Sequence, residues 1–384
     1  MTTRRNGEGS TPPGFFVVEN ASTGFDAFGL TDAVLNASDH PMSKTEQGHR
    51  ADLEAADRAL VADPRNLAAL IAKGDALAGL GDGRAAASFY SSALRVAGDG
   101  KGLAPSVITE LRRAQAAVQA QAQRFEAHLA TSLAAAGFDA ATSSDRFALS
   151  LDLMAGRKRL YQQEPRFYLF PGLPQVQFQP RETLPWLAAI EAATGEIRAE
   201  LDGLLAEPAL FRPYVEPRAD RPNTDASGML ANPDWSALFL WKDGVEQPEL
   251  ARRCPRTLAA LAEVPLCRVP GRTPSILFSK LTPGARIPAH HGLINTRLIC
   301  HLPLIAPPGS RFRVGNDVRD WREGQAWAFD DTIEHEAAND SGQDRTILIF
   351  DVWKPEMSEE ERALVSALFQ AVDGYGAGGQ AWGV

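Results

Sequence analysis

The amino-acid sequence predicts a multidomain α+β protein in which an α-helical module precedes a β-sandwich or jelly-roll domain. Three observations support this prediction. Alanine and leucine dominate residues 46–140, where proline is rare. From about residue 176, prolines and aromatic residues return, and short β-rich segments alternate with turns that contain Gly, Pro and Asp. The chain has 384 residues, more than one average domain needs.

Changes in composition divide the chain into five segments. We expect a flexible N-terminal segment, a helical module, a connecting segment, a β-domain, and a C-terminal helix with a tail. Their predicted boundaries are 1–45, 46–140, 141–175, 176–357 and 358–384.

The helical module contains a pattern typical of a repeat. An Ala-Leu pair that ends at Leu60 recurs at Leu94, 34 residues later, with a Gly-rich turn between the two. Residues 60–97 therefore resemble one tetratricopeptide repeat, a helix–turn–helix unit that stacks on its neighbours. Helices predicted at about 46–60 and 108–136 would complete a short stack. An ordinary Ala-rich helical hairpin is the alternative.

The β-domain is predicted from five short segments with strand character. They are Ser275–Lys280, Thr296–Leu304, Arg311–Val314, Gln325–Phe329 and Thr346–Val352. Many short strands separated by turns are typical of sandwiches and jelly rolls.

Charge and cysteine content narrow the classes of function. The net charge is −9 and the pI about 5.4, so general nucleic-acid binding, which needs clustered basic surface, is not expected. The three cysteines are irregularly spaced, which argues against a disulfide framework or a structural zinc site. A signal-peptide segment and a membrane-length apolar run are both missing. We expect a cytoplasmic protein without membrane contact.

Histidines cluster in the β-domain. Four of the seven in the chain fall between residues 290 and 335: His290, His291, His301 and His335. Histidine is the commonest metal ligand, and non-haem iron oxygenases use two histidines, usually with one carboxylate. Arg345 follows His335 by ten residues. The planar guanidinium of arginine suits a carboxylate ligand.

These residues stand in a pattern that resembles the aspartyl/asparaginyl β-hydroxylase domain over about residues 230–356. The pattern is carried by Asp234–Trp241, His290 with Gly292, Asn295, Arg297, His301-Leu302, Trp321, Glu323-Gly324, Phe329–Asp331, Glu334–Glu336, Phe350–Trp353 and Pro355. The resemblance implies a double-stranded β-helix (jelly-roll) fold and an oxygenase that depends on Fe(II), 2-oxoglutarate and O2.

The resemblance also implies the metal site. His290 and His335 are similar to the two iron ligands of the family. Gly292 stands two residues after His290, where most 2-oxoglutarate oxygenases have Asp or Glu, so a water is expected in that position. Asp330-Asp331 is a second candidate for the missing carboxylate, but an Asx turn explains this pair as well, and we favour the turn.

The cosubstrate site follows in the same way. Arg345 is similar to the arginine that pairs with the distal carboxylate of 2-oxoglutarate, and Ser279 to a serine that assists it. His301 is similar to the histidine near the C1 carboxylate, and Trp235 to an aromatic residue that lines the pocket. The family often has an arginine two residues before that histidine, where this chain has Ile299. Arg297 is the candidate to compensate, although strand alternation puts residues 297, 299 and 301 on one face.

The sequence therefore predicts a 2-oxoglutarate-dependent dioxygenase. By resemblance, it hydroxylates the β-carbon of an Asp/Asn-type side chain in a peptide or protein, with release of succinate and CO2. The peptide is expected to bind between the helical module and the oxygenase domain, since repeat stacks present concave faces. Two alternatives remain open: a different jelly-roll metalloenzyme acting on a small molecule or free amino acid, and a non-catalytic repeat-domain adaptor.

Overall fold

The computed structural model describes residues 45–217 and 228–375. The chain divides into two compact units between Arg159 and Leu160. The second unit thus begins 16 residues (176 − 160) before the predicted start of the β-domain. The predicted flexible segment 1–45 lies outside the described residues, apart from residue 45.

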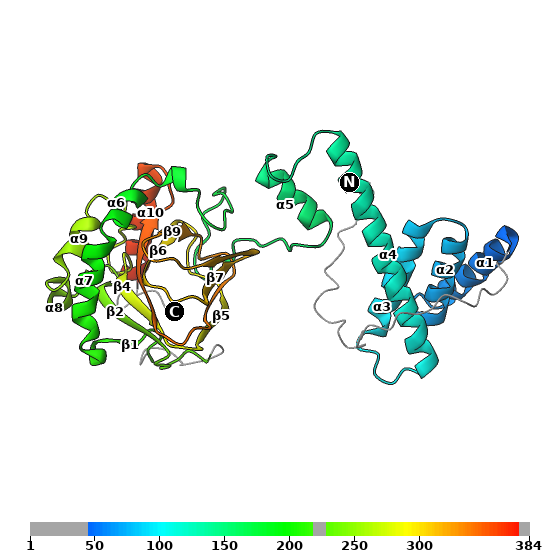
Figure 1. The fold of residues 1–384 in the computed structure, drawn as a ribbon, viewed down its shortest axis with the longest axis horizontal. Helices are drawn as coiled ribbons and strands as arrows, with labels where there is room; N and C mark the ends of the chain where they lie inside the picture. Colours follow the sequence, from blue (N-terminus) through cyan, green and yellow to red (C-terminus); the bar gives the residue numbers. More distant parts are fainter. Residues whose placement is uncertain (1–44, 218–227, 376–384) are drawn as a thin grey trace, which may run out of the picture. The chain divides into compact units, whose positions relative to one another are not determined.

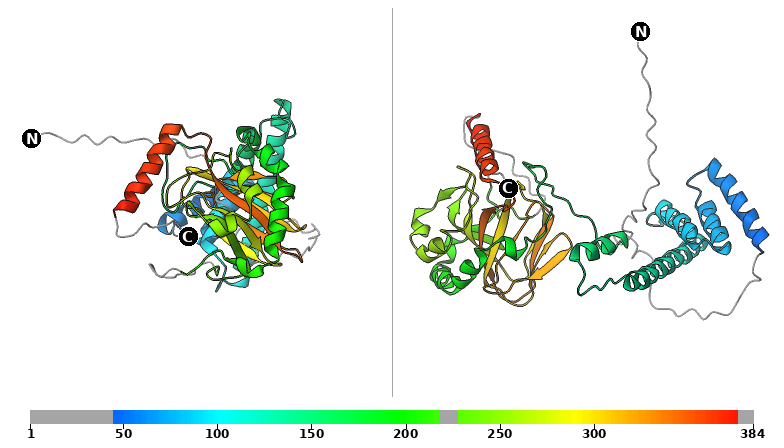
Figure 2. Two further views of the ribbon diagram at one scale, coloured as in Figure 1. Left: turned by 90° about the vertical axis from the view of Figure 1, so that its left-hand side faces the viewer. Right: turned by 90° about the horizontal axis from the view of Figure 1, so that it is seen from above.

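The described part of the first unit is helical, and its helices run side by side in chain order from α1 to α4 (Figures 1 and 2). The helices are α1 (Glu46–Ala62), α2 (Leu67–Gly79), α3 (Gly83–Ala97), α4 (Pro105–Ala135) and α5 (Asp145–Met154). Side-chain oxygens of Thr45, Asn66 and Asp82 cap the first three by accepting a backbone N–H three residues on. The two flanking helices predicted from the sequence correspond to α1 and α4.

Helices α2 and α3 approach closely at Gly74. A Cβ at this position would lie 2.4 Å from the Tyr90 ring, so the glycine makes room for the tyrosine. The Tyr90 hydroxyl donates a hydrogen bond to Asp75 at 2.6 Å. The same two helices bury Leu70, Ala93 and other apolar residues against α4. A tetratricopeptide repeat and an ordinary hairpin can both pack in this way, so the repeat stays a prediction.

The second unit contains two antiparallel sheets in its described residues. The seven-stranded sheet has the order β1-β2-β4-β11-β6-β9, with β3 paired to β2. Its strands are β1 (Arg212–Pro213), β2 (Trp235–Lys242), β3 (Val245–Glu246), β4 (Ile276–Leu281), β6 (Arg297–Ile305), β9 (Trp327–Phe329) and β11 (Arg345–Trp353). The four-stranded sheet has the order β5-β10-β7-β8. Its strands are β5 (Arg286–His290), β7 (Ser310–Val314), β8 (Asp317–Asp320) and β10 (His335–Asn339).

From β4 onward the chain passes back and forth between the two sheets, except at the β7–β8 hairpin. This path is that of a jelly roll. The five predicted strands correspond to β4, β6, β7, β9 and β11, with ends that differ by at most two residues. The sequence did not predict β5, β8 and β10, which complete the four-stranded sheet.

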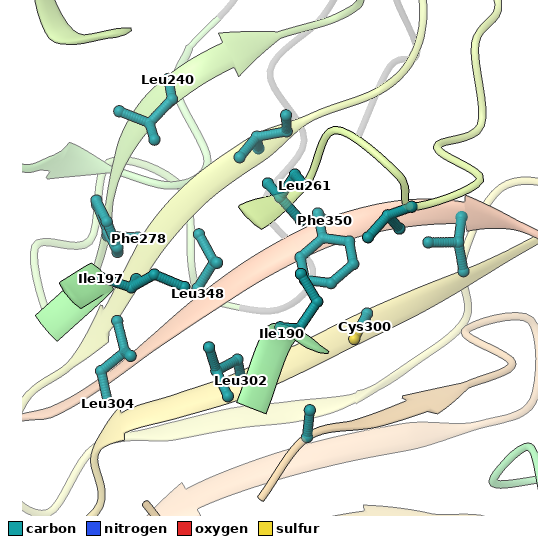
Figure 3. Close-up of a cluster of buried hydrophobic side chains, with 14 of the residues drawn as sticks. Ile190, Ile197, Leu240, Leu261, Phe278, Cys300, Leu302, Leu304, Leu348 and Phe350 are labelled. Atoms are coloured by element: carbon teal, nitrogen blue, oxygen red, sulfur yellow. The ribbon is translucent and has the colours of Figure 1, made fainter. Parts of the chain in front are cut away.

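Helices cover the outer face of the seven-stranded sheet, although the sequence predicted only strands in this part of the chain. They are α6 (Leu187–Ala192), α7 (Thr194–Leu205), α8 (Pro248–Ala251) and α9 (Pro255–Ala260), with short 3-10 turns η2 (Arg181–Thr183) and η3 (Pro208–Leu210). Figure 1 shows α6 to α9 together on one side of the sheets. In Figure 3, Ile190 and Ile197 of these helices lie among Leu302, Leu348 and Phe350 of the sheet. The predicted C-terminal helix is α10 (Glu359–Gly374).

A second core lies between the two sheets. Leu281 and Ile347 of the seven-stranded sheet meet Phe312 and Val314 of the four-stranded sheet there. Because strand residues alternate between faces, Leu298, Cys300, Leu348 and Phe350 point to the helices. Their chain neighbours point into the space between the sheets.

Residues 160–178 run along the loops beside β5 and β10. The backbone N–H of Glu164 donates to the carbonyl of Thr332 at 2.8 Å, and that of Arg166 to the carbonyl of Gly292 at 2.9 Å. These bonds give the physical reason why the second unit begins at residue 160. Of the predicted connecting segment 141–175, residues 160–175 thus lie in the second unit, and residues 141–159, which contain α5, lie in the first.

Candidate active site

His290 and His335 face each other in the four-stranded sheet. His290 ends β5, His335 begins β10, and the two are direct partners in the strand register. Their ring centroids are 4.1 Å apart. The Nδ1 of His290 lies 2.7 Å from the carbonyl of Pro288, and that of His335 lies 3.0 Å from the carbonyl of Ile333. If each Nδ1 donates its proton to that carbonyl, both Nε2 atoms are free to bind a metal.

The electrostatics of this pair favour the neutral rings. Burial lowers the pKa of His290 and holds the pKa of His335 well below its usual range, with a further contribution from the neighbouring His290. Neutral imidazole is the form that binds metals. Within 45–217 and 228–375, no group of three or more His, Cys, Asp or Glu side chains could hold a metal ion. The site therefore offers two histidines without a third protein ligand in the described residues.

Gly292 leaves room for a carboxylate from elsewhere in the chain. A Cβ at residue 292 would lie between 2.1 and 2.6 Å from the carboxylate atoms of Asp331. An Asp or Glu cannot fit here unless Asp331 moves. The Asp331 carboxylate accepts from Arg297 at 3.3 Å. Burial is the main reason why the pKa of Asp331 is raised to about 7.

Asp330 makes the predicted turn. Its Oδ1 accepts hydrogen bonds from the backbone N–H and the hydroxyl of Thr332, at 3.0 and 2.5 Å. Its other oxygen accepts from Lys354 at 2.7 Å and from Gln163 at 2.6 Å. Because both oxygens of the Asp330 carboxylate accept hydrogen bonds within the protein, this carboxylate is not available to a metal.

Arg345 brings a buried positive charge to the space between the sheets. Its side chain is only 1% exposed and lies 4.5 Å over the ring of Trp321. It donates a hydrogen bond to the carbonyl of Ser279 at 3.4 Å, and no carboxylate of the described residues pairs with it. Burial lowers the pKa of Arg345 to about 9, so it is still protonated at neutral pH. A buried unpaired charge is unfavourable, and an anionic ligand would compensate it.

Further buried nitrogens without partners lie near this guanidinium. The Nε of Arg345, the Nδ1 of His301 and the indole N–H groups of Trp321 and Trp327 are buried without hydrogen-bond partners among the described residues. The His301 ring lies 6.0 Å from that of Trp321 and 6.5 Å from that of Trp327. Several orphan donors around one cation fit an anion with several oxygens, such as a dicarboxylate.

Ser279 and Trp235 lie together, as two residues of one site should. The indole N–H of Trp235 donates to the Ser279 hydroxyl at 3.2 Å, and the Trp235 ring lies 6.4 Å from that of His290. Trp235 also stacks on Tyr214 at 4.1 Å. Tyr214 was not singled out in the sequence, because a single tyrosine between prolines carries no signal of its own.

Arg297 is held by two carboxylates. Its guanidinium donates to Asp351 at 2.8 Å and to Asp331 at 3.3 Å. A contact between Arg297 and a cosubstrate would have to compete with these pairs, so that role stays a prediction. Ile299, next on the same face of β6, brings no charge.

The comparison with known families agrees with this arrangement. Residues 191–355 match the family model of the aspartyl/asparaginyl beta-hydroxylases. This segment is similar to the domains of that family. His290, His335, Arg345 and the other residues described above fall inside it, except those of the 160–178 segment.

Several curated proteins are similar to this hydroxylase domain. An ornithine lipid ester-linked acyl 2-hydroxylase of Rhizobium tropici is 38% identical over 176 residues, which is 45% of this chain and 59% of that protein. The aspartyl/asparaginyl beta-hydroxylase of Mus musculus is 36% identical over 35% of this chain and 18% of its own length. The human aspartate beta-hydroxylase domain-containing protein 2 is 29% identical over 54% of this chain and 55% of its own length. The chain thus spans less than two thirds of these relatives.

Solved structures add little to this hydroxylase assignment. The cupin domain of Schizosaccharomyces pombe Cnp3 matches 32% of this chain and 66% of that chain, with 8% identity and a TM-score of 0.22. A likeness this weak carries no argument about this chain. In the part of the chain that the structure describes, no helix is both long and apolar enough to span a membrane.

Proposed function

We propose that this chain is an Fe(II)- and 2-oxoglutarate-dependent hydroxylase. The observation that carries the proposal is the buried guanidinium of Arg345, which has no counter-ion among the described residues and shares the space between the sheets with two facing neutral histidines. An anion with several oxygens would pair with this cation and satisfy the orphan donors around it. The match to the hydroxylase family supports the same conclusion.

The residues take the following proposed roles. His290 and His335 would hold iron through Nε2, with their Nδ1 protons fixed by backbone carbonyls. Arg345, beside Ser279, would hold the far carboxylate of 2-oxoglutarate. Burial and the charge of Arg345 keep the pKa of His301 well below its usual range, so this histidine would offer a hydrogen bond without a charge.

The bound iron would supply oxygen activation, and the protein supplies geometry, charge and shelter from water. In the overall reaction a C–H group, 2-oxoglutarate and O2 give C–OH, succinate and CO2. Because the described residues would contribute only two metal ligands, we expect iron affinity to depend strongly on chelation by 2-oxoglutarate.

Two classes of substrate follow from the relatives. One is the β-carbon of an Asp or Asn side chain in a protein, as predicted from the sequence. The other is the 2-position of an ester-linked acyl chain. The two share their chemistry, because in both the oxidised carbon lies next to a carbonyl carbon.

The test is anaerobic loading with Fe(II) and 2-oxoglutarate, followed by oxygen and measurement of succinate. We expect succinate formation that requires both, and that falls below detection in His335→Ala. A different jelly-roll metalloenzyme, using zinc or manganese, would form no succinate from 2-oxoglutarate. If His335→Ala retained the full biological activity of the protein, the non-catalytic adaptor would be the favoured alternative.

A further inference from the structure

We propose that Gln163 is a positioning residue for the metal histidines, because its side-chain amide joins the loop after His290 to the loop before His335. This inference rests on the proposed function, since it names a residue that sets the geometry of the same site. Gln163 belongs to residues 160–178, which we call the strap. The strap lies outside residues 191–355, the segment that matches the hydroxylase family.

The backbone of the strap is bonded to both histidine loops. The N–H of Arg166 donates to the carbonyl of Gly292, two residues after the first metal histidine (292 − 290). The N–H of Glu164 donates to the carbonyl of Thr332, three residues before the second (335 − 332). The side chain of Gln163 therefore starts where the strap passes both loops.

The Gln163 amide bonds the same two loops through its opposite ends. Its Oε1 accepts from the Nδ2 of Asn295 at 2.9 Å. Its Nε2 donates to the Oδ2 of Asp330 at 2.6 Å and to the carbonyl of Pro174 at 3.1 Å. Asn295 follows the first histidine by five residues (295 − 290), and Asp330 precedes the second by five (335 − 330). One side chain thus cross-links the two segments that carry the metal ligands.

Both partners of this amide are fully buried. Asn295 and Asp330 are each 0% exposed, so neither can replace Gln163 by bulk water. The Asn295 side chain also accepts from the N–H of Phe170 at 2.7 Å and donates to its carbonyl at 2.9 Å, so the strap supplies the partners of this amide. Buried polar groups that lose a partner are costly, so the strap and the two loops are held as one unit.

The chemistry at residue 163 requires an amide, which offers an acceptor to Asn295 and a donor to Asp330. A glutamate would place a second carboxylate against buried Asp330, and like charges sheltered from water repel strongly. Gln163→Glu should therefore break the Asp330 side of the cross-link. Exchange of the two groups, Gln163→Glu with Asp330→Asn, restores one donor and one acceptor and keeps the total charge.

The strand pairing leaves a need for such a cross-link. His290 and His335 are partners in the β5–β10 register, but that register shifts between His335 and Ala337. The two rings, with centroids 4.1 Å apart, thus lie at an irregular end of the strand pair, where ladder hydrogen bonds fix the spacing less firmly. Gln163 acts on the rings through the loops, so its loss should misplace the metal ligands without removing one.

The first experiment measures binding of Mn(II), a stand-in for Fe(II), to the full chain with 2-oxoglutarate present. The electron paramagnetic resonance signal of free Mn(II) reports the affinity. Gln163→Ala should weaken binding about tenfold, since groups that orient metal ligands typically contribute that much or more. Gln163→Glu should weaken it at least as far, and Gln163→Glu with Asp330→Asn should recover most of the loss.

The matched control is Gln179→Ala. Gln179 is a buried amide of the same unit, and it donates to Thr183 and Glu356 instead of the histidine loops. This variant should lower the melting temperature and leave Mn(II) affinity unchanged.

Three results of the first experiment would count against the proposals. Gln163→Ala that is less stable but binds Mn(II) as tightly as the wild type would overturn the positioning role and leave the proposed function standing. A double variant that binds no better than Gln163→Glu would overturn it too. Wild-type protein that binds no Mn(II) would overturn the proposed metal site, and the positioning role with it.

The second experiment tests the cross-link without any metal. Hydrogen exchange of the metal-free full chain, read by mass spectrometry, should be faster in Gln163→Ala over both segments 290–296 and 330–336. The Gln179→Ala control should leave both rates unchanged. Faster exchange in one segment alone, or in neither, would overturn the cross-link whatever metal the site binds.

Discussion

The two faces of β6 and β11 differ in chemistry although they alternate along the same strands. Toward the helices, Leu298, Cys300, Leu348 and Phe350 are completely buried in an apolar core (Figure 3). Toward the four-stranded sheet, the neighbouring positions carry charged residues, a histidine with an orphan nitrogen and partly buried isoleucines. The outer face is apolar and closely packed. The inner face includes buried charged and polar atoms that have no hydrogen-bond partner among the described residues.

This difference separates stability from function. An apolar core stabilises a fold in proportion to the surface it buries. Buried charges without partners destabilise a fold, so proteins retain them mainly at sites where a bound ligand pairs with the charge. Substitutions on the outer face should therefore change folding with little effect on chemistry. Substitutions of the charged and polar residues on the inner face should mainly change ligand binding, and they should change stability only through the charge or space that they remove or add.

The largest effect is expected on the outer face. Phe350→Ala removes a fully buried ring, and the free energy of unfolding should fall by about 3–5 kcal/mol. Activity per folded molecule should stay within about twofold. Chemical denaturation and single-turnover assays below the new melting temperature measure the two quantities. Ile349→Ala, the next residue on the opposite face, is only partly buried, so it is the matched control and should lose less stability.

An acid on the inner face should make stability depend on pH. The pKa of Asp331 is raised from 3.8 to about 7, so the folded protein holds a proton that the unfolded chain has lost. The stability of the wild type should therefore fall, relative to Asp331→Asn, as pH rises from 4 to 7. The shift of about 3 pKa units sets an upper limit of about 4 kcal/mol. Parallel pH–stability curves for the two proteins, with the exposed Asp320→Asn as a control, would contradict the assignment.

Substitution of Arg345, a cation of the inner face, should have the opposite pattern to Phe350→Ala: little loss of stability and a large loss of cosubstrate affinity. Arg345→Met removes a buried charge that has no counter-ion in residues 45–217 and 228–375, so the free protein should be as stable as the wild type or more stable, by about 1–4 kcal/mol. The requirement for 2-oxoglutarate should increase about 100-fold, since charge-assisted hydrogen bonds contribute about 1.5–3 kcal/mol. Thermal unfolding with and without 2-oxoglutarate measures both. A variant that loses stability and keeps its cosubstrate affinity would place Arg345 in the structural framework.

The sequence predicted the two faces unequally. Apolar alternation was enough to predict β6 and β11, and the histidine and arginine pattern pointed to His290, His335 and Arg345. Strands β5 and β10 escaped prediction because RIPAH and HEAAN are too polar and short to show strand periodicity; their pairing depends on tertiary register. Apolar residues between positions 187 and 205 do recur at helical spacing, but the density of prolines and aromatic residues around this segment favoured strands.

The partners within the site could not be predicted from the sequence. Asp331 reaches the space above Gly292 because a turn at Asp330 and the register of β10 bring it there. Tyr214 reaches Trp235 through strand pairing of β1 with β2. Such contacts join residues far apart in the chain, and single-sequence patterns record only local spacing.

The smallest effect is expected at Gly292, where the inner face is most crowded. Gly292→Ala would place a methyl group within 2.1–2.6 Å of the Asp331 carboxylate, so Asp331 must move. Overpacking of this kind typically destabilises by about 1–3 kcal/mol, and we expect the lower end because a side chain rather than backbone is displaced. Asp331→Gly in the same chain should recover most of the loss. In a double-mutant cycle, an interaction energy near zero would show that the two residues do not share this space.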